Sequence, residues 1–184
     1  MLLCAVFWLW SGKATDYYHA VDMAFAFDIR EVSGCTCRRA RRATRILTHI
    51  YDRALEPVGL TANQFDLLTN LFGASLTEQK CLPIGTLAAR MGMHPTTLTR
   101  DLKPLIARRL VADTNDPRDG RVRAVLFTGE GRYKLRKAVP AWRRAQKQVE
   151  SALGAEAALA LNTLLDAATT KLTPPRRRRM SMRR

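Results

Sequence analysis

Two short amphipathic segments separated by a tight turn constrain the fold of this 184-residue chain more than any other feature. The apolar residues of the first segment recur with helical spacing: Ile84, Leu87, Ala88 and Met91. Gly92 ends this segment, and Pro95 takes the first helical position of the next. The second segment has its own apolar stripe: Leu98, Leu102, Leu105 and Ile106. Two helices joined by the turn 92–94 predict a helix-turn-helix.

A charged hairpin is expected directly after these helices. The segments 110–114 (LVADT) and 122–127 (VRAVLF) are rich in β-branched and apolar residues and flank the turn cluster NDPRDG. At the tip, Asp119 is placed to bond backbone N–H groups or to orient a neighbouring guanidinium beside Arg121, and Gly120 permits a positive φ. Helix, turn, helix and hairpin in this order are typical of a winged helix-turn-helix.

Further helices are expected before this unit. Residues 37–55 carry a helical apolar stripe behind a run of arginines. Thr61 and Gln64 have the spacing of a capping box, which begins a helix that continues through Phe72. The polar residues 73–80 are expected to form a loop.

A long helix is expected after the hairpin, from its cap Thr128 to Leu153, with a last helix ending at Leu172. Six residues of the long helix, spaced alternately four and three apart, resemble a heptad seam: Leu135, Val139, Trp142, Gln146, Val149 and Leu153. A small domain cannot cover such a seam, so the pattern indicates a partner. The predicted fold class is mainly α with a small β-hairpin wing.

The charge of the chain favours a polyanionic partner. The net charge is +15, and six arginines in the last nine residues contribute six of these charges, which leaves +9 on the rest. On the second helix of the helix-turn-helix, the face opposite the apolar stripe carries hydroxyls and cations and no acid. Such a face suits a major groove, and an arginine on a narrow ribbon suits a minor groove. We therefore predict contacts to double-stranded DNA from Thr96, Thr97, Thr99, Arg100, Lys103, Arg118, Asp119, Arg121 and Arg123.

Residues 36–172 resemble the MarR family of winged helix-turn-helix transcriptional regulators. The resemblance lies in LTANQFDLLTNL, LPIGTLAARMGMHPTTLTRDLKPLIARRLV and DPRDGRVRAVLFTGEGRYKL, above all in Asp119-Gly120-Arg121 followed by LFTGEG. It implies an intertwined homodimer, most often a repressor, that binds a pseudo-palindromic operator. Two positions depart from the family pattern: His94 stands where Asp, Ser or Asn is usual as the helix N-cap, and Pro104 lies inside the recognition helix, where its missing N–H is expected to cause a bend.

The resemblance implies a division of the chain into segments. Residues 34–57 and 129–172 are expected to form the dimerisation helices, and residues 58–128 the DNA-binding lobe. Residues 1–33 have no family counterpart and are either a poorly ordered extension or the result of a start assigned too early, with Met23 as the alternative start. Residues 173–184 are expected to be a basic disordered tail.

Two kinds of effector remain open at this point. Cys35 and Cys37 lie near the start of a helix beside arginines, and both features stabilise a thiolate, so these thiols are candidates for sensing an oxidant. The alternative is that they are incidental, because a disulfide between residues two apart is strained. Related regulators bind small aromatic acids, for which four aromatic residues are candidate linings or simply core: Tyr51, Phe65, Phe72 and Trp142.

Other classes of function fit the sequence less well. It has no Gly-rich phosphate loop, nucleophile elbow or His-acid pairing at a readable spacing, which argues against an enzyme. The three histidines and four cysteines show no zinc spacing, so we expect neither a metal nor a cofactor. The four cysteines do not form a secreted disulfide pattern and the apolar N-terminus is too short to span a bilayer, so the expected location is cytoplasmic, away from membranes. The remaining alternative is a nonspecific nucleic-acid-binding protein driven by its basic body and arginine tail.

Overall fold

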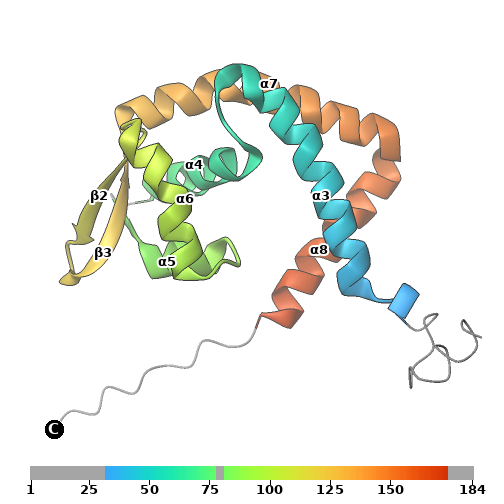
Figure 1. Ribbon diagram of the computed structural model, residues 1–184, viewed down its shortest axis with the longest axis horizontal. Helices are drawn as coiled ribbons and strands as arrows, with labels where there is room; N and C mark the ends of the chain where they lie inside the picture. Colours follow the sequence, from blue (N-terminus) through green and yellow to red (C-terminus); the bar gives the residue numbers. More distant parts are fainter. Residues whose placement is uncertain (1–31, 78–80, 174–184) are drawn as a thin grey trace, which may run out of the picture. The chain divides into compact units, whose positions relative to one another are not determined.

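The computed structural model describes residues 32–77 and 81–173 (Figure 1). Its helices are α3 (Thr36–Leu55), α4 (Ala62–Ser75), α5 (Ile84–Arg90), α6 (Pro95–Ala107), α7 (Gly129–Leu153) and α8 (Ala155–Leu172), with the 3-10 helix η1 (Glu56–Val58) after α3. Its strands are β1 (Cys81–Pro83), β2 (Val111–Asp116) and β3 (Asp119–Phe127). A mainly helical chain with a small antiparallel sheet confirms the predicted fold class.

The described chain divides into two compact units between Ile46 and Leu47, so that the division falls within α3. Residues 1–31, 78–80 and 174–184 lie outside the described part of the chain. The predictions for the N-terminal extension, including Met23 as a start, therefore concern residues that lie almost wholly outside the described part of the chain. The same is true of the prediction for the basic tail.

The hairpin of the wing is confirmed, and it belongs to a three-stranded sheet. The strand order is β1-β3-β2, with both pairings antiparallel, and β3 runs between the other two. Leu82 of β1 lies opposite Val125 of β3, and each is 1 % exposed. β1 was not predicted from the sequence, because a three-residue strand is too short for a recognisable alternation and only its pairing with β3 defines it.

The core of the second unit is built from the predicted apolar stripes. Ile84, Leu87 and Ala88 of α5 are buried, and so are Leu98, Leu102 and Leu105 of α6. They pack in one cluster with residues of α4 and the sheet, including Leu67, Leu68, Leu71, Val111 and Val125. The two helices of the helix-turn-helix are thus held on a common core, and their polar faces point outward.

Two predicted N-caps are formed as expected. The Thr61 hydroxyl accepts from the Gln64 backbone N–H at 3.2 Å, and the Gln64 side chain accepts from the Thr61 N–H, which completes the capping box. The Thr128 hydroxyl accepts from the Gly131 N–H at 3.0 Å at the start of α7. The predicted end of α4 is wrong, because the helix runs on to Ser75. Burial of Ala74, which is 4 % exposed, offsets the cost of Gly73 within the helix.

The predicted seam of α7 is only partly correct. Its buried residues are Gly131, Leu135, Ala138, Ala141 and Ala145. Of the predicted seam, Leu135 is buried, the next four residues are half-buried and Leu153 is exposed. The reason is that α7 packs directly on the core through Ala138 and Ala141, and small side chains permit this close approach.

Candidate DNA-binding interface

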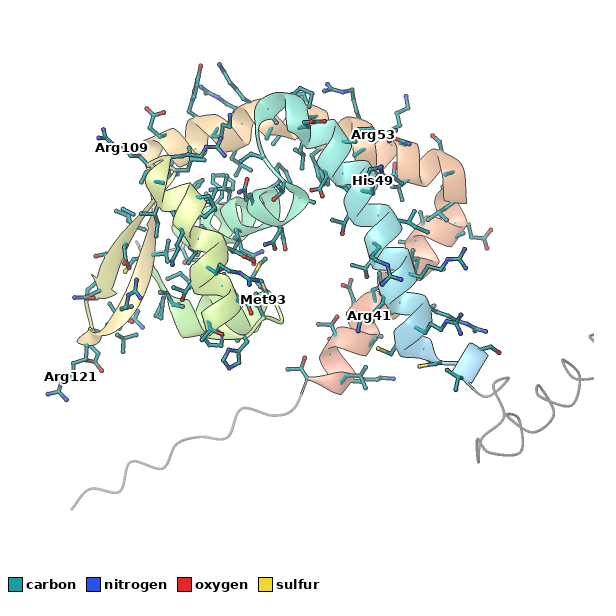
Figure 2. All side chains as sticks on the ribbon, in the orientation of Figure 1. Arg41, His49, Arg53, Met93, Arg109 and Arg121 are labelled. Carbon is teal, nitrogen blue, oxygen red and sulfur yellow. The ribbon has the colours of Figure 1, made fainter. Side chains whose placement is uncertain are left out.

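The turn of the helix-turn-helix fixes the start of α6. Gly92 has a φ of 61°, a left-handed conformation that glycine adopts without steric cost. Met93, labelled in Figure 2, lies in this turn. His94 is the N-cap, and its Nδ1 accepts from the Thr96 N–H at 3.4 Å, which is long for a hydrogen bond. The expectation of a weak cap at His94 agrees with this distance.

The outward face of α6 carries the predicted contact residues in two settings. Thr96, Arg100 and Lys103 are exposed, whereas Thr97 and Thr99 are half-buried. The Thr99 hydroxyl donates to the Pro95 carbonyl at 2.9 Å, and the Thr96 hydroxyl lies 2.8 Å from His94 Nδ1. These two hydroxyls are therefore held within the first turns of the helix, and Arg100 and Lys103 are the cations that this face presents to a partner.

Two expectations about α6 concern Pro104 and the lack of an acid on its outward face. The helix continues through Pro104 as far as Ala107, so the proline does not end it. The outward face lacks an acid, as expected, although Asp101 directly follows Arg100. The Asp101 side chain is only 23 % exposed, and it turns toward α4, where it accepts a hydrogen bond from Asn63.

The tip of the wing is shaped by two aspartates that bond the backbone. Asp116 Oδ1 accepts from the Arg118 N–H at 2.9 Å, and Asp119 Oδ1 accepts from the Arg121 N–H at 3.1 Å. Of the two arrangements considered for Asp119, the hydrogen bond to a backbone N–H is the one formed, and its contact with DNA stays a prediction. The expected use of a positive φ at Gly120 is wrong, since its φ is not positive and it lies within β3. Figure 2 shows Arg121 at the tip of the wing, with its side chain directed away from the sheet.

The arginines of the wing are not equivalent. Arg123 forms an ion pair with Asp113 of β2, a diagonal neighbour on the adjacent strand. In the described part of the chain, Arg118 and Arg121 have no such carboxylate partner, and both are exposed. Of the predicted wing contacts, these two are therefore the arginines whose charge is available to a partner.

Comparison with solved structures decides the family. Neither a protein-family model nor a curated protein sequence matches the chain. The transcriptional regulator MosR of M. tuberculosis is 38 % identical in its crystal structure, with a TM-score of 0.60, and the match covers 74 % of this chain and 97 % of MosR. The chain belongs to the MarR family. The complex of MosR with DNA matches at 37 % identity and a TM-score of 0.61, over 76 % of this chain and 99 % of that one.

The namesake of the MarR family shares the fold. A cysteine-to-serine mutant of E. coli MarR, in complex with operator DNA, matches with a TM-score of 0.66 over 80 % of this chain and all of that chain. Its identity is only 21 %, so this likeness concerns the fold alone.

This MarR-family protein has an apolar cavity beside the first half of α7. Its volume is about 450 Å³, which is within the range of small-molecule sites. It is lined by Phe72, Gly129, Arg132, Tyr133, Leu135, Arg136 and Val139. The α7 residues of this lining were not predicted from the sequence, because only the packing of α4 beside α7 brings Phe72 to them.

The four aromatic residues considered as linings of a ligand site have different positions. Phe72 lines the cavity. Phe65 and Trp142 stack on each other, with ring centroids 6.1 Å apart, and pack against the core. The Tyr51 hydroxyl donates to Gln146 Oε1. For the last three, the interpretation as core is the one that these contacts support.

The candidate sensing cysteines lie at the start of the described chain. Cys35 and Cys37 are both exposed and free, and Cys37 is in the first turn of α3. In residues 32–77 and 81–173, no group of three or more His, Cys, Asp or Glu side chains could hold a metal ion. None of the described helices combines the length and the hydrophobicity needed to cross a bilayer.

Proposed function

We propose that this protein is a homodimeric, sequence-specific DNA-binding transcriptional regulator that acts as a repressor at a pseudo-palindromic operator. The observation that carries the proposal is the placement of exposed cations on two neighbouring elements of one lobe, Arg100 and Lys103 on α6 and Arg118 and Arg121 on the wing. The solved complexes of MosR with DNA and of a MarR mutant with operator DNA support it.

The two elements have different tasks in this proposal. The α6 helix enters a major groove, where Arg100 pairs with guanine O6 and N7 and the methyl groups of Thr96, Thr97 and Thr99 contact thymine methyls or position the helix. Arg121 enters the adjacent minor groove, where a narrow A·T-rich stretch attracts a guanidinium. Lys103 and Arg118 neutralise phosphates, and Arg123, paired with Asp113, contributes less charge.

The homodimer is proposed from the uncovered face of α8. Leu164, Leu165 and Leu172 follow one stripe of this helix and are 68 %, 47 % and 80 % exposed. A second copy of the chain would bury them. Sedimentation velocity tests this: the double variant Leu164→Glu/Leu165→Glu should be monomeric, whereas Thr163→Glu/Thr170→Glu, on the opposite face of α8, should remain dimeric. A wild-type monomer at micromolar concentration would contradict the proposal.

The operator proposal is tested by selecting bound sequences from a random duplex pool at near-physiological salt. We expect an inverted repeat with half-sites about one helical turn apart. Recovery of no motif, with binding that vanishes as salt is raised, would instead support the nonspecific nucleic-acid-binding alternative.

The wing is tested with the selected operator. Arg121→Ala should weaken operator binding by about tenfold or more, because it removes a groove contact that is formed only in the complex. Arg144→Ala removes the same charge from an exposed site on α7 and is the matched control. Equal affinities of the two variants would remove the wing from the mechanism.

We further propose that a small aromatic acid releases the protein from DNA by binding in the cavity between α4 and α7. Phe72 and Tyr133 offer aromatic contacts there, and the guanidinium groups of Arg132 and Arg136 offer charge for a carboxylate. Benzoate and its hydroxylated forms are suitable probes. They should release operator DNA from the wild type and not from Arg136→Gln, and release from both alike would exclude this site.

Oxidation of Cys35 and Cys37 is the second proposed signal, supported by their exposure and by the arginines that follow them. Operator binding before and after mild peroxide, in the wild type, Cys35→Ser and Cys37→Ser, tests it. Binding by the wild type that is insensitive to peroxide would end this proposal and leave the two thiols as incidental.

A further inference from the structure

Asp101 connects the proposed base-reading arginine to another helix. Its Oδ2 accepts from Asn63 Nδ2 of α4 at 2.9 Å, and its Oδ1 lies 3.7 Å from Arg100 Nε. The side chain of Asp101 is 23 % exposed, whereas that of Arg100 is 77 % exposed. One carboxylate is therefore anchored on its inner side and contacts the outward-facing guanidinium on its other side.

Neither attraction to DNA nor the helix dipole explains an acidic residue at position 101. Asp101 is the sole acidic residue of α6, on a helix that is proposed to approach phosphates. It lies beyond the first turn, so the helix dipole does not favour its charge. A carboxylate at this position weakens the attraction of α6 to DNA. We therefore expect its contribution to lie in its contacts with Asn63 and Arg100.

The support for Asp101 is itself held in place. Asn63 is in the first turn of α4, between residues whose backbone is already bonded. The Ala62 N–H donates to Asp52 Oδ1 at 2.6 Å, and the Gln64 N–H donates to the Thr61 hydroxyl. The start of α4 thus presents the Asn63 amide from a fixed backbone position.

We propose that Asp101 is a positioning residue that, anchored by Asn63, aims the Arg100 guanidinium at base edges and thereby sets base specificity. Contact through Nε leaves both terminal nitrogens of Arg100 for a bidentate contact with guanine O6 and N7. Pre-orientation also reduces the rotamer entropy that a free arginine loses on binding. The inference rests on the proposed function, because it assumes that Arg100 meets DNA.

Two variants separate the anchor from the charge. Asp101→Asn keeps an oxygen that can accept from Asn63 and removes the negative charge beside Arg100, whereas Asn63→Ala removes the anchor and keeps the charge. Asp66→Asn removes one charge from an exposed site on α4 and is the matched control. Thermal unfolding is used to choose a temperature at which every variant is folded.

The measured quantity is discrimination, the ratio of the dissociation constants for a base-substituted and an unsubstituted operator, at each position of the half-site. Asp101→Asn and Asn63→Ala should each lower discrimination by about tenfold at one and the same position, the one that Arg100→Ala also affects. Binding of Asp101→Asn to nonspecific DNA should be at least as tight as that of the wild type, because a negative charge has been removed. In an Arg100→Ala background, Asp101→Asn should cause no further loss.

Two results would overturn the positioning role while leaving the proposed function intact. One is that Asp101→Asn and Asn63→Ala both leave discrimination unchanged, although the wild type prefers a clear motif. The other is a loss from Asp101→Asn that persists in the Arg100→Ala background, which would mean that Asp101 contacts a base itself. A wild type without any base preference would instead refute the proposed function, and this inference with it.

Discussion

Gly131 lies against the carbonyl oxygen of Leu110 so closely that a Cβ on Gly131 would be 2.2 Å from that oxygen and 2.7 Å from the Phe127 ring. The Thr128 hydroxyl bonds the same carbonyl at 2.8 Å and caps α7 by accepting from the Gly131 N–H. The link between α6 and β2 and the start of α7 therefore meet in a joint that has no room for a side chain.

Gly131→Ala should destabilise the protein, because the new methyl group would clash with the Leu110 carbonyl on one side and the Phe127 ring on the other. We expect a loss of about 2 kcal/mol or more in the free energy of unfolding, measured by urea denaturation. Gly129→Ala is the control, since a Cβ there meets nothing within 4 Å. Equal stabilities of the two variants would show that the joint can relax.

Arg109→Gly should stabilise the protein. Arg109 has a φ of 56° just after α6, where its N–H donates to the Ile106 carbonyl and the next N–H donates to the Leu105 carbonyl. This is a Schellman motif, whose left-handed position favours glycine, so we expect a gain of about 0.5 to 1 kcal/mol in thermal or urea unfolding.

Arg108→Gly is the control for this position, because Arg108 has an ordinary right-handed φ and its Nη1 donates to the Gly59 carbonyl at 2.8 Å. It should lower stability. If Arg109→Gly lowered the free energy of unfolding as much as Arg108→Gly does, the left-handed conformation of Arg109 would carry no penalty.

His94→Ser should strengthen the start of α6. The bond that His94 accepts from the Thr96 N–H is 3.4 Å long, and serine is a better N-cap. We expect a gain of about 0.5 to 1 kcal/mol in the free energy of unfolding. His94→Ala, which offers no acceptor, should be less stable than the wild type, and a serine variant no more stable than the alanine variant would refute the role of the cap.

Tyr51 should make the stability of the protein sensitive to alkaline pH. Burial of the phenol, and secondarily the charge of Glu150, raise the pKa of Tyr51 above its ordinary value of 10.0. A group whose pKa is raised in the folded state contributes stability that is fully present below its unfolded pKa and is lost as pH rises through the folded pKa. The contribution of Tyr51 is thus complete below about pH 10 and declines above it.

Comparison with Tyr51→Phe measures this contribution. Below pH 10.0 the variant should be less stable by about 1 kcal/mol, because it lacks the hydrogen bond to Gln146. The difference should shrink when unfolding is measured at successively higher pH. A difference that stays constant through pH values well above 10.0 would show that the pKa of Tyr51 is the same in the folded and unfolded states, so that folding does not raise it.

Much of the candidate site was predictable because its signals are local. Arg121 and Asp119 were identified from their spacing within one turn, and the hydrogen bond between them confirms this geometry. The ion pair of Arg123 with Asp113 was not predicted, because it depends on which residues of β2 and β3 become diagonal neighbours. Asn63 carries no sequence signal at all, since its partner Asp101 is 38 residues further along the chain.

The sequence by itself determined which segments form helices and which faces of α5 and α6 point inward. Capping residues such as Thr61 and Thr128, and apolar residues three and four positions apart, act within one or two turns of a helix, so their effect can be read without knowing the fold. Tertiary structure alone decided that β1 pairs with β3, that Ala138 and Ala141 form the inner face of α7, and that Gly131 must lack a side chain. These features arise where separate elements come into contact, and close packing there depends on the shapes of both partners.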